Sequence, residues 1–439
     1  MNPYCFVLMP FGRKSDESGR VVEFDVVYDQ IIAPAIQEAS LEPIRADEEI
    51  IGGIIHKPMF ERLMMCDYAV ADLTTANANV FYELGVRHGV RPYSTVAIAG
   101  SGMRMPFDVS PLRAILYNVD DYGFPENTIK VRQSLTERLE ACRDPEDDSP
   151  LYQLLTDVPR PDLQRLKTDA FRDMVEYSKA MKERLRQARE QDGDAIGRIE
   201  KEINVVDADP AIVIDLFLSY RAVKDWDRMI SLTDKMAPPL KQTILVQEQL
   251  GFALNRIGRH KDAEGLLREL INNYGPSSET NGILGRVYKD QWVKAKASQS
   301  PAAGAFLKKA IDAYRQGFES DWRDAYPGIN AVTLMECSDP PDPMREELIP
   351  VVAYSVKRRL ASKDPDYWDY ATELEIHVLS QKREEAQNAL GRAIASIREK
   401  WEPETTANNL RMIREAREGR GVDCEWIKDI EIVLEKYRT

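Results

Sequence analysis

Four polar side chains near the N-terminal end of the sequence have types and a spacing that suit chemistry at a sugar. They are Asp72, which ends an apolar segment, Asn77 and Asn79, in the polar stretch after it, and Glu83, in the next amphipathic segment. Cleavage of an N-glycosidic bond leaves an oxocarbenium-like sugar, which a carboxylate near C1′ stabilises or attacks. Glu83 is therefore our candidate nucleophile, and Asp72 would orient a sugar hydroxyl or protonate the leaving base. The two asparagines would contact the substrate.

Each of these residues also has a purely structural explanation, which the sequence leaves open. Asn79 is a suitable N-cap, and Glu83 would interact favourably with the N-terminal end of a helix. Asp72 could form an Asx-turn after its strand. The functional interpretation is favoured for the four residues together, because Phe81 and Leu84 already supply the apolar face of that helix.

Two loops could complete a ligand site. Pro10, Phe11 and Gly12 follow the first apolar segment, where the backbone N–H groups of a tight turn could hold a phosphate. Asp108 lies in a loop after the fourth apolar segment and could face the ligand, although the same loop could simply pack Phe107 on a sheet.

The elements that must position these residues alternate between strands and helices. We expect strands near residues 6–9, 43–46, 68–72, 95–99 and 114–117, and helices over 24–39, 54–66 and 79–90. This alternation predicts an α/β doubly wound parallel sheet of the flavodoxin-like kind, with helices on both faces. Ligands of such sheets bind beyond the carboxyl ends of the strands, where the four polar residues fall.

The strand signals stop near residue 125, and helical segments follow. An acidic linker over 144–150 precedes a long charged helix over 167–190. One later segment matches the tetratricopeptide pattern of small and large residues, at Gly251, Leu254, Gly258, Ala263, Leu267 and Leu270. We therefore expect an α/β domain over 1–125, a helical linker region over 126–205, and an all-α tetratricopeptide-like solenoid with a regulatory role over 206–439.

The composition excludes several classes of protein. The chain has 439 residues and a net charge of −14, which disfavours non-specific binding to nucleic acid. No apolar run approaches the ~20 residues of a membrane span, and the N-terminus lacks the basic start of a signal peptide. The five cysteines are scattered and the four histidines lie far apart, so we expect neither disulfides nor a metal site. A cytoplasmic protein without a metal or another cofactor is the expectation.

The motif around Glu83 resembles the nucleoside 2-deoxyribosyltransferase superfamily, and most closely its deoxyribohydrolase-like branch, which is related to TIR domains. The resemblance covers roughly residues 4–120 and depends on residues 71–85 and on Met9 to Gly12. It implies a deoxyribosyltransferase-like fold in which a glutamate after the third strand acts at C1′, and Glu83 matches that glutamate. The transferases carry an aspartate six residues before it, where this chain has Asn77. Because of this difference, the resemblance is weaker evidence for the deoxyribosyl specificity and for the transfer step than for the action of Glu83 at C1′.

A second resemblance covers the helical part of the chain. Residues 279–290, 314–319 and 326–331 resemble the tetratricopeptide-like regulatory region of apoptosis signal-regulating MAP kinase kinase kinases, known as a TRAFs-binding domain. The resemblance implies a regulatory role, and prokaryotic relatives with both regions are associated with nucleotide signalling and conflict systems. A concave, partly cationic groove for an anionic ligand or a peptide could be lined by Asn281, Arg286, Lys289 and Asn330. The same residues could instead cap helices and join neighbouring units.

Two hypotheses of function follow. The first is an enzyme: an N-glycosidase-like hydrolase of a nucleoside, nucleotide or NAD-like substrate, coupled to a helical sensor or docking domain, in nucleotide signalling or antiphage defence. The alternative is a non-catalytic nucleotide-signal sensor or scaffold, which relays ligand binding to a protein partner. Both predict a nucleotide-derived small molecule and a protein as partners, with a homo-oligomer as a further option and with no nucleic acid or membrane.

Overall fold

A computed structural model of the chain describes residues 2–15, 20–45, 56–103, 113–144, 148–155, 168–361, 365–399 and 401–437. The chain packs as two compact units. The first contains Met1–Val223 and Lys235–Thr243, and the second contains Lys224–Asp234 and Ile244–Thr439. The two units are described separately below.

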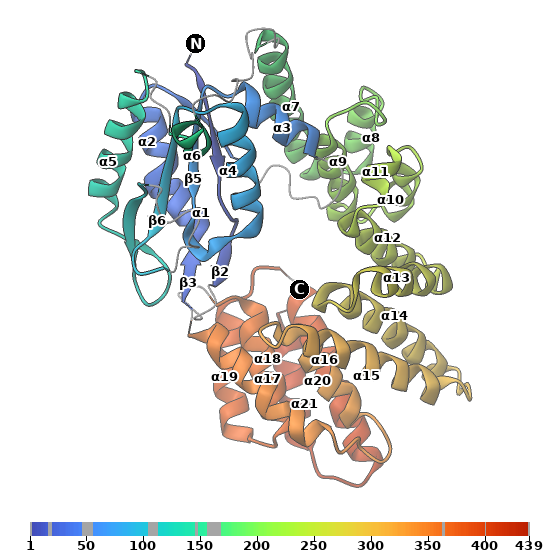
Figure 1. Ribbon diagram of the computed structural model, residues 1–439. Coiled ribbons are helices and arrows are strands. Elements are labelled where there is room, and N and C mark those ends of the chain that lie inside the picture. Colours follow the sequence, from blue (N-terminus) through green and yellow to red (C-terminus); the bar gives the residue numbers. More distant parts are fainter. Residues whose placement is uncertain are drawn as a thin grey trace. The chain divides into compact units, whose positions relative to one another are not determined.

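A six-stranded sheet forms the centre of the first unit (Figure 1). Its order is β4 (Glu42–Arg45), β1 (Tyr4–Leu8), β5 (Tyr68–Asp72), β6 (Thr95–Gly100), β7 (Ile115–Val119) and β8 (Pro125–Glu126). All pairs are parallel except β7 with β8. The predicted parallel sheet is therefore confirmed. The direction of strand addition reverses between β1 and β5, which is the position where doubly wound sheets bind ligands.

Helices cover both faces of this sheet, because successive residues of its buried strands point to opposite sides. Cys5 and Val7 of β1 pack in one core, and Phe6 and Leu8 pack in another. The first core is covered by α1 (Phe24–Val27), the π-helical turn η1 (Tyr28–Ile32), α2 (Ala33–Glu38) and α5 (Thr128–Ala141). The second is covered by α3 (His56–Met65) and α4 (Ala78–Val90). The expected helix over 24–39 thus contains a π turn, which ends two residues before Pro34, a residue without a backbone N–H.

A small hairpin that the sequence analysis did not anticipate follows β1. It pairs β2 (Arg13–Ser15) with β3 (Val21–Glu23) in antiparallel fashion. The N–H of Glu23 donates to the carbonyl of Gly123, in the turn between β7 and β8. Gly123 has a φ of +95°, and a Cβ there would lie 2.8 Å from the carbonyl oxygen of Val21. The hairpin therefore reaches from the end of β1 to the end of β7, at the carboxyl edge of the sheet.

The helices after β8 continue the first unit. They are α5, α6 (Pro150–Leu154), α7 (Thr168–Arg189), α8 (Gly193–Glu200), α9 (Pro210–Ala222) and α11 (Pro238–Lys241). The end of the expected acidic linker is attached to the sheet, because the Asp148 carboxylate accepts a hydrogen bond from the N–H of Thr95, at 2.6 Å. Lys179 of α7 pairs with Glu42 of β4. The two packed units thus divide the chain at other positions than 125 and 205. The domain boundaries expected at those two positions stay predictions.

The second unit is all helical, as expected for the solenoid (Figure 1). It begins with α10 (Trp226–Thr233), and five helix pairs follow: α12 (Ile244–Arg256) with α13 (His260–Tyr274), α14 (Ser278–Ala297) with α15 (Ala303–Ser320), α16 (Ala325–Glu336) with α17 (Arg345–Leu360), α18 (Tyr367–Leu379) with α19 (Arg383–Ala395), and α20 (Trp401–Gly419) with α21 (Glu425–Glu435). Within the described residues, none of the helices is long and apolar enough to cross a membrane.

Two glycines of this unit stand where neighbouring helices approach closely. A Cβ on Gly251 would lie 3.0 Å from Leu267, and one on Gly285 would lie 2.6 Å from the Tyr314 ring. Such close contacts explain why helical repeats have small residues where neighbouring helices meet.

Candidate functional site

Asp72, the first predicted catalytic residue, is completely buried at the carboxyl end of β5. One carboxylate oxygen accepts a hydrogen bond from the N–H of Thr74, at 3.0 Å, and the other accepts one from the Tyr117 hydroxyl, at 2.9 Å. Burial raises the pKa of Asp72 to about 6, although both hydrogen bonds favour the charged form. The contact with Thr74 is the Asx-turn that the structural explanation anticipated. In this geometry protein groups enclose the carboxyl, and its catalytic role stays a prediction.

Thr74 and Tyr117 belong to the same buried network, and the sequence analysis missed both. The Thr74 hydroxyl accepts a hydrogen bond from the N–H of Gly100, at 2.7 Å, and lies 2.9 Å from the Tyr117 hydroxyl. The network therefore joins the carboxyl ends of β5 and β6 to the middle of β7. Thr74 could have been found from its position two residues after Asp72, whereas Tyr117 lies 45 residues away and carries no local signal.

Asn77, not Asn79, caps the helix that carries Glu83. The Asn77 side-chain oxygen accepts hydrogen bonds from the N–H groups of Asn79, at 2.9 Å, and Val80, at 3.3 Å. Asn79 is exposed within the first turn of α4, so the expectation that it provides the cap is wrong. Glu83 lies in the second turn and is half-buried, too far from the first turn for a strong interaction with the helix dipole. A substrate-binding role for both asparagines stays a prediction.

Asp25 and Arg45, which were not among the predicted site residues, contact the loop after β1. The N–H of Gly12, where φ is +57°, donates to the Asp25 carboxylate at 3.2 Å. Arg45 pairs with Asp25, and its guanidinium lies 5.1 Å from the centre of the Phe11 ring. Burial raises the pKa of Asp25, but the hydrogen bonds from Arg45 and Gly12 outweigh it and hold that pKa below its ordinary value. The Gly12 amide predicted to hold a phosphate is thus occupied by a carboxylate, with Pro10 buried just before it.

The remaining predicted site residue of this unit, Asp108, lies outside the described residues. Among the described residues, no group of three or more His, Cys, Asp or Glu side chains is arranged to hold a metal ion.

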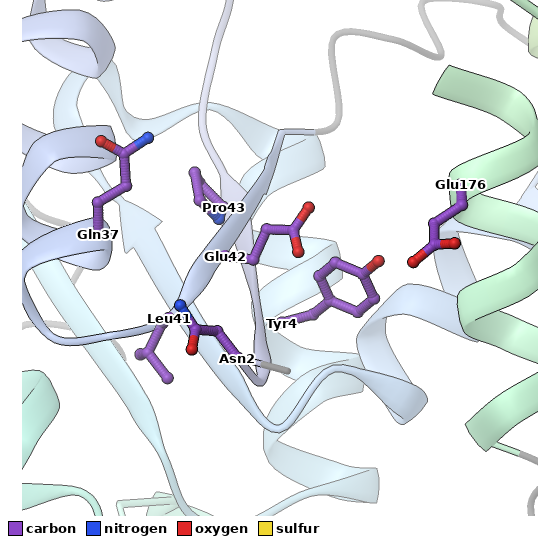
Figure 2. A pocket seen from close by; sticks show the side chains of 7 residues that line it. All are labelled: Asn2, Tyr4, Gln37, Leu41, Glu42, Pro43 and Glu176. Atoms are coloured by element: carbon purple, nitrogen blue, oxygen red, sulfur yellow. The ribbon is translucent and has the colours of Figure 1, made fainter. Parts of the chain in front are cut away.

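A depression of about 340 Å³ lies at the other end of the strands, where β1 and β4 begin (Figure 2). It is lined by Asn2, Tyr4, Gln37, Leu41, Glu42, Pro43 and Glu176. Figure 2 shows the Tyr4 ring between the carboxyl groups of Glu42 and Glu176. Lys179 pairs with Glu42 at 2.6 Å and lies 5.8 Å from the centre of the Tyr4 ring, so a cation of the protein already pairs with one of the two carboxylates here. The depression therefore does not coincide with the predicted crevice.

In the second unit, Lys289 and Asn330 meet in a buried polar network rather than beside open solvent. The Lys289 ammonium donates to the side-chain oxygens of Asn330, at 3.2 Å, and Asn409, at 3.0 Å. Asn409 in turn donates to the Glu375 carboxylate at 3.0 Å. Burial lowers the pKa of Lys289 and raises that of Glu375. Glu375 and Asn409 were not among the predicted residues. Glu375 could have been found as a polar residue within the largely apolar α18, whereas α20 is too polar for Asn409 to stand out.

Arg286 and Asn281, the other predicted groove residues, also contact their own surroundings. The Arg286 guanidinium donates to Asp290 at 2.9 Å, and Asp290 accepts a second hydrogen bond from Asn255 of α12 at 2.7 Å. The Asn281 side chain is 1% exposed and accepts a hydrogen bond from the N–H of Ser277, at the start of α14. The four residues thus make the capping and interhelical contacts of the second explanation, and their role as a ligand-binding set stays a prediction.

The two units together define a class of protein: an α/β sheet domain joined to a stack of helix pairs. Residues 80–432 match the model of the MAP3K TRAFs-binding domain family, which is most of the chain. The chain therefore belongs to this family. The matched region begins within α4 and ends within α21, so it includes part of the first unit and the helix pairs of the second.

Two curated relatives are mitogen-activated protein kinase kinase kinases by name. Kinase nsy-1 of Caenorhabditis elegans is 28% identical over 255 residues, which are 52% of this chain and 17% of that protein. Mitogen-activated protein kinase kinase kinase 15 of Mus musculus is 29% identical over 258 residues, which are 54% of this chain and 19% of that protein. The chain thus spans less than a fifth of the length of either relative. These comparisons support the predicted regulatory helical region, and the deoxyribosyltransferase-like resemblance stays a prediction.

Two solved tetratricopeptide repeat proteins resemble parts of the chain only loosely. The one from Thermus thermophilus has a TM-score of 0.35 at 14% identity, over 46% of this chain and 98% of that chain. The one from Parabacteroides merdae has a TM-score of 0.34 at 12% identity, over 61% of this chain and 99% of that chain.

Proposed function

We propose that this chain is a non-catalytic scaffold whose helical unit binds a protein partner of the TRAF class, for which its family is named. The family match over residues 80–432 carries this proposal. Stacked helix pairs present extended surfaces to proteins, which makes this architecture suitable for docking. The described part of the predicted catalytic crevice supports it as well, because Asp72 is enclosed and the Gly12 amide is bonded to Asp25.

A calorimetric titration of the purified full chain with a purified TRAF-class protein tests this proposal. We expect saturable binding with a defined stoichiometry, and we expect the Glu83→Gln variant to bind with the same affinity. A chain that is folded by circular dichroism but shows no saturable heat with that protein contradicts the proposed partner. Binding that disappears in Glu83→Gln contradicts the proposal that the helical unit provides the contact.

If the chain is a sensor, the α/β unit would also bind a small ligand. A nucleotide-derived ligand would bind at the carboxyl ends of β1 and β5, where the strand order reverses, and its occupancy would alter docking to the partner. Repeating the titration with and without a panel of nucleotides and NAD measures this coupling directly. A change in partner affinity supports the sensor, since allostery is a coupling free energy between two sites. Unchanged affinity, together with no nucleotide binding, leaves the plain scaffold.

A second candidate function is the hydrolysis of an N-glycosidic bond in the same crevice. One observation favours it: α4, which carries Glu83, follows β5 at the point where the strand order reverses. Incubating the chain with nucleosides, nucleotides and NAD, followed by chromatography of the free base, tests this activity. We expect release to be lost in Glu83→Gln and kept in Glu140→Gln, a matched change at an exposed glutamate near the end of α5. No release at all, or release that survives in Glu83→Gln, contradicts it.

A further inference from the structure

Helix α20 contacts helices that belong to earlier repeats. In a simple solenoid, each repeat packs only on its sequence neighbours. Here Asn409 of α20 accepts a hydrogen bond from Lys289 of α14, which lies 120 residues earlier. Arg417 of α20 pairs with Glu336, the last residue of α16. Helix α20 therefore lies over a surface formed by α14, α16 and α18, where an open solenoid would expose its inner face.

The side of α20 that meets this surface has the spacing of an amphipathic docking helix. Thr406, Leu410, Ile413 and Arg417 follow one another at intervals of four, three and four residues, which places them along one stripe. Leu410 and Ile413 are completely buried in the hydrophobic core of the unit. Thr406 is bonded to the Tyr367 hydroxyl of α18 at 2.9 Å. This is the pattern by which helices bind in grooves of partner proteins.

Two polar side chains fix the position of α20 within the surface. Asn409 uses both ends of its amide, accepting from Lys289 and donating to Glu375. A helix without an amide there would leave Lys289 and Glu375 buried with fewer partners, which carries a large free-energy cost. One oxygen of Glu375, Oε2, has no hydrogen-bond partner within the described residues, so α20 does not satisfy the surface completely.

Arg417 provides the second fixed contact, eight residues further along α20. Its guanidinium donates to Glu336 at 2.9 Å and to the backbone carbonyls of Val378 and Leu379, at the end of α18. Glu336 also pairs with Arg345 of α17, which does not depend on α20. The carboxylate would therefore keep a partner if α20 left, and the surface could persist without its present occupant.

We propose that α14, α16 and α18 form a helix-docking groove, that α20 is its internal occupant, and that a partner docks by presenting an amphipathic helix with an amide and, eight residues later, an arginine. The proposal deepens the proposed scaffold function and rests on it, because it names the kind of segment that the protein partner would insert. Docking then competes with α20, so the solenoid is autoinhibited until α20 is displaced.

A fluorescent peptide with the sequence of residues 401–419 serves as the probe. Its binding to the full chain is measured by anisotropy for the wild type, for Asn409→Ala and for Asn408→Ala. Asn408 is the matched control, because it is an exposed neighbour on α20 whose side chain accepts a hydrogen bond from Arg411 of the same helix. We expect Asn409→Ala to bind the peptide about tenfold more tightly than the other two chains, since loss of a buried hydrogen bond weakens the internal helix. A peptide that carries Arg417→Ala should bind the Asn409→Ala chain about tenfold more weakly than the unchanged peptide does.

Equal binding to all three chains, or no binding to any, overturns the proposal when hydrogen exchange of α14 and α15 shows that the variants are folded. If Asn409→Ala does not fold, hydrogen exchange of the wild type decides. If the amides of α20 and α21 exchange through an opening of lower free energy than those of α16, α20 is displaceable and the proposal is supported. If all three helices exchange through openings of the same free energy, the proposal is overturned. The peptide assay needs no external protein. Its failure is therefore distinguishable from a failure of the TRAF-class titration.

Discussion

Asp72 is a carboxyl group whose protonation is linked to the stability of the first unit. Its two hydrogen bonds favour the ionised form, but complete burial at the end of β5 opposes ionisation more strongly and raises its pKa to about 6. An unfolded chain would ionise the same group near its ordinary value of about 4. Between these values the folded state binds more protons than the unfolded state, so the stability contributed by Asp72 is present at low pH and is lost as the pH rises.

We expect the substitution Asp72→Asn to reveal this linkage. Relative to the variant, the unfolding free energy of the wild type should fall by roughly 3 kcal/mol as the pH rises from about 4 to about 7. Urea unfolding, read through hydrogen exchange of the β5 amides, measures the difference at each pH. Asp121→Asn, at an exposed carboxyl in the turn between β7 and β8, is the control for a general charge effect. A constant difference between wild type and Asp72→Asn across this range contradicts the linkage.

The sequence predicted the local contacts of the site residues better than their distant ones. The Asx-turn of Asp72 was available as one alternative, because it involves a residue two positions away. Tyr117 and Arg45 were not foreseen, since a tyrosine or an arginine in an expected strand gives no indication of which strand end it will reach. The polar contacts of Lys289 illustrate the same limit, because Asn409 is 120 residues away.

At the scale of elements, the beginning of α4 depends on one asparagine. Asn77→Ala should lower the unfolding free energy of the first unit by about 1 kcal/mol, since the N–H groups of Asn79 and Val80 lose their acceptor. Asn79→Ala should change it by less than about 0.5 kcal/mol, because that side chain is exposed. Thermal unfolding of both variants compares them directly. A larger effect at Asn79 than at Asn77 would contradict the assignment of Asn77 as the cap.

The close approach of α14 and α15 gives a prediction with opposite signs at two glycines. A Cβ at Gly285 would lie 2.6 Å from the Tyr314 ring, so Gly285→Ala should destabilise the second unit by about 1–3 kcal/mol through overpacking. A Cβ at Gly265, on the exposed side of α13, would meet no atom within 4 Å. Gly265→Ala should therefore stabilise it by up to about 1 kcal/mol. Urea unfolding of the two variants tests the signs, and a neutral Gly285→Ala would show that the helices separate easily.

The sequence predicted most elements of the fold, and its failures have physical causes. Apolar runs and helical spacing located the parallel strands and the helices between them, because these elements bury whole faces. The hairpin of β2 and β3 was missed because its three-residue strands are short and its first strand is charged. Helix α5 was assigned to a linker, yet Val131, Leu135 and Leu139 pack in the same core as the sheet. Periodicity indicated the helix but not the surface that it covers.

At the scale of the whole molecule, the family match covers parts of both packed units, whereas the proposed docking surface lies within the second. The net charge of −14 does not identify a ligand, and buried cations such as Arg45 and Lys289 are already engaged by groups of the protein. Docking through exchange of a helix would depend on apolar contacts and a few buried polar ones. We therefore expect partner affinity to depend only weakly on salt, since buried pairs are screened much less than exposed ones.

The substitution Glu83→Gln separates the two proposed functions in a single protein. It removes one carboxylate from α4 in the first unit, while the proposed groove of α14, α16 and α18 lies in the second. If the chain is a scaffold, the affinity of the partner should stay within about twofold of the wild type, a difference of about 0.4 kcal/mol. If the α/β unit controls docking through hydrolysis of a nucleotide-derived ligand, loss of the nucleophile should shift partner affinity in the presence of that ligand, but not in its absence. Titrations of wild type, Glu83→Gln and Glu140→Gln with and without the ligand therefore decide between a carboxylate that reacts and one that only belongs to the fold.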